Sequence, residues 1–211
     1  LNPVAMEAGL KAITKQRPLI NSASGRTDSK ELMLPLAQKY NTDLVLSVFT
    51  DTGCPPDSDS RIEAIMDTAA YANELGIPNE DLWIDPVLLP VSADQGVIVQ
   101  VLEFMKVLDD VLPGAKSTIG LSNVSNGTPE ELRGWLNRTM MVMLGRYNMY
   151  SVIADSFDSD LIAINNGEKP EVVDIIYKVM DGEDVDAASV TGDLVNYVKT
   201  AQVMLGETLY S

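Results

Sequence analysis

The chain of 211 residues contains no histidine, and this absence excludes several kinds of catalytic site. Ser-His-Asp and Cys-His relays, HExxH zinc sites and imidazole general acids all require an imidazole ring. Any chemistry must therefore use carboxylates, amides, hydroxyls or a borrowed cofactor. We expect no bound metal ion.

Basic residues and long apolar runs are scarce as well. The formal net charge of -16 comes from 15 Lys and Arg against 31 Asp and Glu, which disfavours binding to DNA, RNA or anionic membranes. The longest apolar stretches, such as Met140–Leu144, are far shorter than the ~20 residues of a membrane helix, and no secretory signal is visible. The sequence predicts a soluble protein with no nucleic-acid or membrane partner.

Cys54 is the only cysteine, so no internal disulfide can form. Ten methionines beside one free thiol are typical of a reducing compartment, and we expect a cytoplasmic location. Hydrophobic residues make up 45% of the chain, which predicts a single globular domain over residues 1–211. The start at Leu1-Asn2-Pro3, without an initiator methionine, indicates part of a longer polypeptide.

Short apolar runs alternate with longer amphipathic stretches, as in repeated βα units. Five runs are expected to be buried strands: Pro18–Ile20, Leu44–Phe49, Leu82–Ile84, Thr118–Leu121 and Ser151–Ala154. A polar residue closes each run, and these residues are Asn21, Asp51, Asp85, Asn123 and Asp155, spaced by 30, 34, 38 and 32 residues. This spacing is near that of one βα unit and predicts a parallel α/β fold, either an open doubly wound sheet or a (β/α)8 barrel.

Helices are expected between these strands. The expected caps and ranges are Asp28 for the first helix, Ser58 or Asp59 for the second, 97–112 for the third, Thr128 with Pro129 for the fourth, and 193–205 for the closing helix. Residues 156–211 carry a local net charge of -8, and residues 166–200 are expected to form an acidic helical excursion. Its acidic turn Asp181–Asp186 lacks the spacing of a calcium loop and is interpreted as a solvated turn.

Ligands of parallel α/β proteins bind at the carboxyl ends of the strands. Here those ends carry amides and carboxylates and no basic residue, which suits a neutral heterocycle rich in hydrogen-bond donors better than a phosphorylated sugar. No GxGxxG or GxxxxGK[ST] motif occurs. For each strand-end residue taken alone, a helix N-cap remains the alternative role.

Six segments at these strand ends together resemble the pterin-binding methyltransferases, above all those that use methyltetrahydrofolate and a corrinoid/iron-sulfur protein. The segments are Leu19–Ser22, Asp57–Arg61, Asp81–Pro90, Gly120–Ser125, Asn137–Thr139 and Ile153–Asp155. The folate domain of cobalamin-dependent methionine synthase and dihydropteroate synthase are more distant relatives. The resemblance covers residues 1–165 and resumes over 201–211.

The resemblance implies a TIM (β/α)8 barrel of the pterin-binding type, of which this chain holds strands four to eight and a C-terminal helical extension. The first three strands, with one further pterin-binding aspartate, would precede Leu1. Five strands cannot close a barrel and would leave exposed sheet edges. We therefore expect either a truncated chain or a rearranged assembly.

The resemblance also assigns roles to individual residues. Asn21 and Asp85 resemble pterin hydrogen-bonding residues, and a carboxylate at Asp85 can accept the exocyclic amine and the ring N–H of a pterin side by side. The other positions that match substrate-contacting residues are Gly120, Ser122, Asn126, Arg133 and Ile153. Asn126 stands where a family member has Gln, so its contact would be shorter.

Asn123 resembles the residue proposed to assist methyl transfer in this family. Its amide can donate a hydrogen bond to N5 of the folate, and that bond strengthens in the transition state. The resemblance implies methyltetrahydrofolate as substrate, a cobalamin-type corrinoid carried by a partner protein, and a homodimer. It places the reaction in one-carbon metabolism, in the reductive acetyl-CoA pathway.

Two alternatives keep the same pterin site. One is another corrinoid acceptor, as in O-demethylase or methylamine-type systems, because the motifs recognise the pterin and not the partner. The other is a non-catalytic corrinoid-docking barrel subunit, against which Asn123 beside Asp85 and Asn21 argues. Dihydropteroate synthesis would need basic groups for a diphosphate leaving group, which the strand ends lack.

Overall fold

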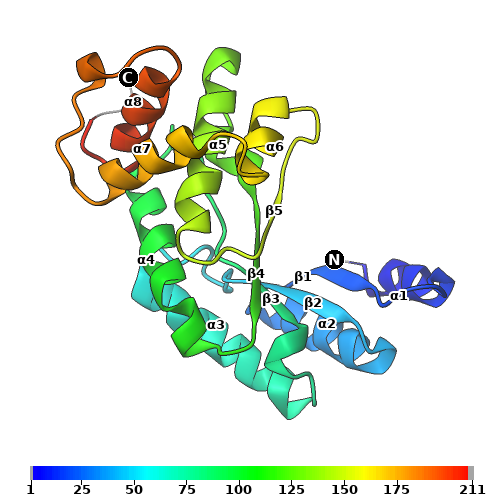
Figure 1. The fold of residues 1–211 in the computed structure, drawn as a ribbon. Coiled ribbons are helices and arrows are strands. Elements are labelled where there is room, and N and C mark those ends of the chain that lie inside the picture. The colour runs from blue at the N-terminus through cyan, green and yellow to red at the C-terminus, as the bar shows by residue number, and fades with distance from the viewer. Residues whose placement is uncertain (1, 209–211) are drawn as a thin grey trace. The chain divides into compact units, whose positions relative to one another are not determined.

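The computed structural model describes residues 2–208. The chain divides into two compact units, each of which is formed from two stretches of sequence. The first unit comprises Leu1–Val87 and Lys106–Ile119, and the second comprises Leu88–Met105 and Gly120–Ser211. Helices and strands alternate along most of the chain (Figure 1).

The first unit contains a parallel sheet. Its elements are α1 (Pro3–Ala12), β1 (Leu19–Ser24), α2 (Thr27–Tyr40), β2 (Asp43–Ser47), α3 (Ser58–Glu74), the 3-10 turn η1 (Asn79–Asp81), β3 (Leu82–Asp85) and β4 (Lys116–Gly120), of which Gly120 falls in the second unit. The pairs β1–β2, β2–β3 and β3–β4 are all parallel. The strands follow one another in chain order, without the reversal of a doubly wound sheet.

The second unit is largely helical. Its elements are the 3-10 turn η2 (Leu121–Ser125), α5 (Glu130–Gly145), β5 (Ser151–Ile153), α6 (Ser159–Asn165), α7 (Pro170–Met180), the 3-10 turn η3 (Ala187–Ser189) and α8 (Leu194–Met204). The helix α4 (Gly96–Val111) begins in the second unit and ends in the first. The strand β5 is the last in the strand order.

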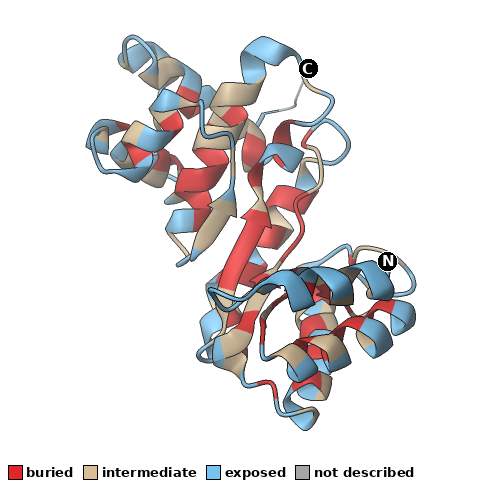
Figure 2. Cartoon of the chain, turned by 90° about the vertical axis from the view of Figure 1, so that its right-hand side faces the viewer, coloured by how far each residue is buried: buried red, intermediate tan, exposed pale blue. Residues whose placement is uncertain are grey.

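Apolar strands and one-sided helices form the core of the first unit. Leu44, Val45 and Leu46 are all buried, because β2 has a neighbouring strand on each side and both of its faces are covered. On α2 the buried residues Met33 and Ala37 lie four apart, which places them on one side of the helix. Figure 2 shows the same division of helices into a buried and an exposed side.

All five expected strands are present, and the expected parallel α/β fold is confirmed. The first strand does not end at Ile20 but continues to Ser24, with a register shift between Ile20 and Ala23. The second ends at Ser47 and not at Phe49, because Thr50 exchanges two backbone hydrogen bonds with Gly53 and turns the chain.

The structure corrects three expected helix starts. The carboxylate of Asp57 caps α3 by accepting the N–H of Ser60 at 2.8 Å, so neither Ser58 nor Asp59 is the cap. Asp28 lies in the first turn of α2, after Arg26 at the cap position. The hydroxyl of Thr128 donates to the carbonyl of Ser125 and leaves the start of α5 without a side-chain cap.

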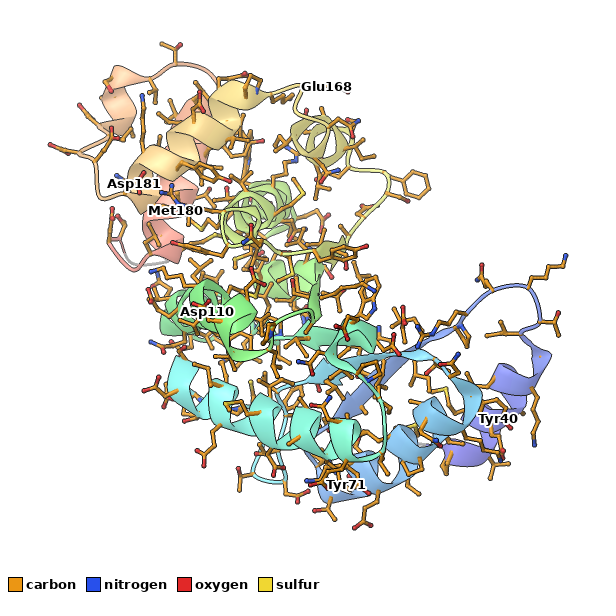
Figure 3. All side chains as sticks on the ribbon, turned by 60° about the horizontal axis from the view of Figure 1, so that its bottom comes forward. Tyr40, Tyr71, Asp110, Glu168, Met180 and Asp181 are labelled. Atoms are coloured by element: carbon orange, nitrogen blue, oxygen red, sulfur yellow. The ribbon has the colours of Figure 1, made fainter. Side chains whose placement is uncertain are left out.

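Residues 166–200 contain α7 and the beginning of α8. Val172, Ile176 and Val179 form the buried side of α7, so its amphipathic pattern has a packing role. Met180 and Asp181 mark the end of this helix in Figure 3. Asp181 then pairs with Arg146 at 2.6 Å.

Among residues 2–208 no helix combines the length and the apolar character needed to cross a bilayer.

An ion pair between two helices of the second unit gives a test of the packing. Asp158 caps α6 through the N–H of Leu161 and binds Arg138 of α5, and the two side chains are only 12% and 17% exposed. We expect Asp158→Ala to lower the free energy of unfolding by roughly 2 kcal/mol, because it removes a cap and leaves the poorly solvated Arg138 with the more exposed Asp160 as its remaining ion-pair partner. Urea unfolding at pH 7 measures this change.

Asp160→Ala is the matched control, because Asp160 also pairs with Arg138 but is 40% exposed. A clearly smaller loss is expected there. Equal losses for both variants would contradict the assigned role of Asp158.

Candidate functional site

Three polar residues lie in one row across the sheet of the first unit. Ser24 of β1 is in register with Ser47 of β2, and Ser47 is in register with Asp85 of β3. Because parallel strands end at the same edge of a sheet, this row marks the carboxyl edge, where ligands of such folds bind. Asn21 lies three residues before Ser24 on β1, and its side chain is exposed, with no hydrogen-bond partner among the described residues.

Asp85 is the last residue of β3 and is half-buried. Its Oδ1 atom accepts the backbone N–H of Val87 at 2.8 Å, and its Oδ2 atom has no hydrogen-bond partner among the described residues. Burial raises the pKa of Asp85 to about 6, while the Val87 N–H and the charge of Arg61 oppose this rise. The carboxylate therefore has one oxygen fixed by the chain and one available to a ligand.

Arg61 supports the turn that follows Asp85. Its side chain is fully buried, and its Nη1 atom donates to the carbonyls of Pro86 and Val87, the latter at 3.1 Å. Its Nε and Nη2 atoms have no partner among the described residues. No role for Arg61 was predicted from the sequence. Two signals were available: its place in the segment Asp57–Arg61 that carries the family resemblance, and its place four residues before Ile65, on the buried side of α3.

Cys54 lies near both of these charged groups and is half-buried. Burial raises the pKa of the Cys54 thiol, the charge of Asp85 raises it further, and the charge of Arg61 lowers it. The net rise keeps the sulfur protonated at neutral pH, so the thiolate needed for nucleophilic chemistry is disfavoured.

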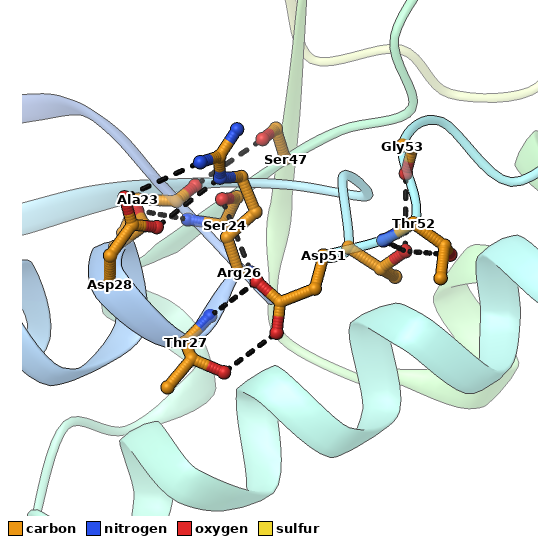
Figure 4. A network of polar contacts seen from close by, with 11 residues as sticks. Ala23, Ser24, Arg26, Thr27, Asp28, Ser47, Asp51, Thr52 and Gly53 are labelled. Atoms are coloured by element: carbon orange, nitrogen blue, oxygen red, sulfur yellow. Dashed lines mark hydrogen bonds and ion pairs between the residues drawn. The ribbon is translucent and has the colours of Figure 1, made fainter.

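A depression of about 620 Å³ lies at the ends of β1 and β2, lined largely by hydroxyl groups and by Arg26 and Asp51. The carboxylate of Asp51 accepts the N–H and the hydroxyl of Thr27 at 3.1 and 2.7 Å, and Arg26 pairs with Asp28 (Figure 4). These hydrogen bonds lower the pKa of Asp51. Asp51 thus serves the start of α2, the alternative role that strand-end residues can take.

In the second unit, the predicted site residues cluster in one turn. Asn123 lies in η2, its side chain is exposed, and its amide has no hydrogen-bond partner among the described residues. Its backbone carbonyl accepts the N–H of Asn126 at 3.1 Å. A Cβ atom added to Gly120 would lie only 3.3 Å from the Nδ2 atom of Asn123. The absence of a side chain at Gly120 therefore makes room for this amide.

The remaining predicted residues of the second unit lie around this turn. The carbonyl of Ser122 accepts the hydroxyl of Ser125 at 3.2 Å, and the same hydroxyl is 3.5 Å from Nε of Arg133. Arg133 also pairs with Glu130, so its guanidinium is partly occupied. Ile153 is 56% exposed on β5, a strand that contacts η2.

Asp155, the last of the strand-end carboxylates, accepts the N–H of Phe157 at 2.9 Å and so stabilises its own loop. Over residues 2–208 no group of three or more His, Cys, Asp and Glu side chains is placed to hold a metal ion.

Comparison with known proteins shows the family and a relative of this chain. The family model for pterin-binding enzymes matches residues 1–153. The methylcorrinoid:tetrahydrofolate methyltransferase of Eubacterium limosum is 24% identical over 158 residues, which are 72% of this chain and 58% of that protein. The chain therefore spans a little over half the length of this relative. The family match and the chain-ordered parallel strands confirm the expected fold, part of a TIM-barrel-type pterin-binding fold.

The raised pKa of Asp85 predicts a measurable effect of pH on stability. A carboxyl group whose pKa is higher in the folded chain makes stability fall as pH rises from about 4 to about 6, because the folded state must then lose a proton that the unfolded state has already lost. Asp85→Asn keeps a side-chain oxygen for the Val87 N–H and removes this titration. At pH 7 we expect the variant to be more stable than wild type by up to about 3 kcal/mol.

Urea unfolding of both proteins between pH 4 and pH 8 tests this expectation. Their difference in stability should grow over the interval from pH 4 to pH 6 and be constant above it. A difference that does not change with pH would show that Asp85 titrates normally.

Proposed function

The chain belongs to the family of pterin-binding enzymes, and on this premise we propose that it binds methyltetrahydrofolate and transfers its N5-methyl group to the Co(I) corrinoid of a partner protein. The relative from E. limosum is named for a methylcorrinoid and tetrahydrofolate, the same pair of reactants with the methyl group moving the other way. A residue that stabilises the shared transition state serves both directions.

The observation that carries the proposal is the carboxylate of Asp85. Its Oδ1 atom is held by Val87, its Oδ2 atom has no partner among the described residues, and its position is the carboxyl end of a parallel strand. The pyrimidine ring of a pterin offers an amine and an adjacent ring N–H. A carboxylate has about four lone-pair sites, so Oδ2 can accept one of these donors while Oδ1 accepts the other beside the N–H of Val87. Two such donors would offset part of the desolvation that raises the pKa of Asp85.

Asn21 supports the same recognition. Its exposed amide has no partner among the described residues, and an amide can both donate to and accept from a pterin ring. A site of amides and carboxylates binds a neutral heterocycle without needing a counter-ion, which agrees with the scarcity of basic residues at the strand ends.

Asn123 is proposed to assist the methyl transfer. When the N5–CH3 bond breaks, the methyl group bonds to cobalt and the electron pair of the broken bond goes to N5, which then takes up a proton. The exposed amide of Asn123 can donate to N5 as this negative charge develops. Gly120 leaves the space that the amide occupies. Ser122, Asn126, Arg133 and Ile153 are proposed as further substrate contacts.

The proposal extends to the setting of the reaction. The proposed partner is a corrinoid protein, and the first choice is a corrinoid/iron-sulfur protein. We further propose that the chain acts as a homodimer in the cytoplasm. The corrinoid proteins of O-demethylase or methylamine-type systems are the alternative acceptors. The name of the E. limosum relative supports a corrinoid reactant of either kind.

Folate binding is the first test. Isothermal calorimetry with methyltetrahydrofolate should show binding that weakens as pH falls below about 6, because protonated Asp85 loses half of its acceptor capacity. Asp85→Asn should weaken binding by about ten- to a hundredfold, since an amide replaces a charged acceptor of two hydrogen bonds. Asp67→Asn, which changes an exposed carboxylate of α3, is the control and should bind as wild type does. Absence of folate binding by the wild-type protein would refute the proposal.

Methyl transfer is the second test. Asn123→Ala should lower kcat for methylation of a Co(I) corrinoid, followed by absorbance, by about 10²- to 10³-fold, as loss of one transition-state donor does. Its folate affinity should change little. Asn79→Ala is the control, because that amide donates to the carbonyl of Pro113 and accepts from Nδ2 of Asn73, neither of which is a proposed site residue. Tight folate binding with no methyl transfer by the wild-type protein would favour the docking role instead.

A further inference from the structure

We propose that Arg61 is a positioning residue for Asp85. Arg61 holds the backbone turn after Asp85, and the N–H of Val87 in this turn binds one carboxylate oxygen and leaves the other for the ligand. This inference deepens the proposed function and rests on it. It concerns only residues of the first unit, on α3 and at the end of β3.

The turn after Asp85 has an unusual backbone. Val87 has a φ of 61°, in the left-handed region that a β-branched residue rarely adopts. Its side chain is only 7% exposed, so the residue is packed in this conformation. Such a backbone persists only where the surroundings impose it, and it is typical of functional sites.

Arg61 supplies the contact that imposes this conformation. The carbonyls of Pro86 and Val87 flank the Cα atom of Val87, and the single Nη1 atom of Arg61 donates to both. A donor shared by two successive carbonyls keeps them pointing the same way, which fixes the two dihedral angles between them. The N–H of Val87 is thereby aimed at Oδ1 of Asp85, 2.8 Å away.

Stability alone does not account for an arginine at this position. The side chain is fully buried, its Nε and Nη2 atoms have no partner among the described residues, and burial lowers the pKa of its guanidinium. An apolar side chain of similar length would avoid this desolvation. A role in holding Asp85 explains both the buried cation and the strained valine.

The positive φ of Val87 and the hydrogen bonds from Arg61 also predict how the position of Asp85 can be restored without the arginine. Glycine adopts a positive φ at no steric cost. Val87→Gly should therefore let the turn form without the hydrogen bonds from Arg61, even though it removes a buried side chain.

The experiment combines Arg61→Met, Val87→Gly and the double variant, with Arg17→Met as control. Arg17 also holds two neighbouring carbonyls, those of Asn41 and Thr42, but its ion-pair partners Asp43 and Asp81 lie at the amino ends of strands.

Binding is measured with methyltetrahydrofolate by calorimetry at pH 8, where Asp85 is ionised in wild type, alongside thermal unfolding of each variant. Arg61→Met should weaken binding by about tenfold or more, as loss of a supporting hydrogen bond does. The double variant should recover to within about threefold of wild type, although it is no more stable than Arg61→Met. Arg17→Met should lose stability and keep its affinity. If the double variant binds as poorly as Arg61→Met, the positioning role is refuted.

A second readout is independent of folate. The amide resonance of residue 87 in NMR spectra should follow the titration of Asp85 in wild type, lose this response in Arg61→Met and regain it in the double variant. Arg61 and Cys54 are the charged or titratable groups that affect Asp85 or are affected by it, so the titration is repeated with Cys54→Ser. If wild type binds no folate, the proposed function fails while this NMR pattern still decides the role of Arg61. An unchanged amide response in Arg61→Met would overturn the inference.

Discussion

Parallel strand pairing is the constraint on which the first unit depends. Because β1, β2 and β3 run in one direction and are in register, Ser24, Ser47 and Asp85 reach the same edge of the sheet. The alternation of buried Leu82 and Ile84 with half-buried residues fixes the register of β3, since a slip of one residue would turn the two buried side chains toward the less buried face. The position of Asp85 is thus a consequence of core packing, and its chemistry follows from that position.

The electrostatics of this edge oppose stability. Asp85 is held in surroundings that raise its pKa to about 6, and Arg61 is buried beside it without full hydrogen bonding. Each charge is more costly there than at the surface. Asp85 and Arg61 form no direct ion pair among the described atoms. The guanidinium of Arg61 instead donates to backbone carbonyls. A carboxylate kept free of a cation remains available as an acceptor.

The sequence predicted what depends on local pattern. Apolar runs of three to six residues located all five strands, and the polar residue after a run located Asp85, because both follow from burial and chain direction. The role of Asp51 could not be predicted from local pattern, because its carboxylate binds Thr27, 24 residues earlier in the chain. The contact of Arg61 with the Pro86 carbonyl spans 25 residues and leaves no periodic signal beyond one charged position on a buried helix side.

The predictions of helix caps were wrong for a related reason. Asp57, Ser58 and Asp59 are all good capping residues, and the sequence alone does not tell which of them adopts the extended backbone that a cap requires. Which residue becomes the cap depends on the direction in which the preceding loop approaches the helix, and tertiary contacts determine that direction. Gly120 was identified only by the family resemblance, as a substrate-contacting position, and the structure adds that its lack of a side chain leaves room for the amide of Asn123.

A pterin would change the balance at Asp85 in a definite direction. In the free chain the ionised carboxylate lowers stability near neutral pH, since burial deprives it of water and one N–H from Val87 only partly compensates. A ligand that brings two N–H donors to Asp85 favours the ionised form and lowers its pKa. Binding and folding are then linked through one group, because a ligand that binds only the folded state stabilises it by mass action. The cost of keeping this carboxylate half-buried in the free protein is therefore part of the affinity and selectivity for a ligand that presents paired donors.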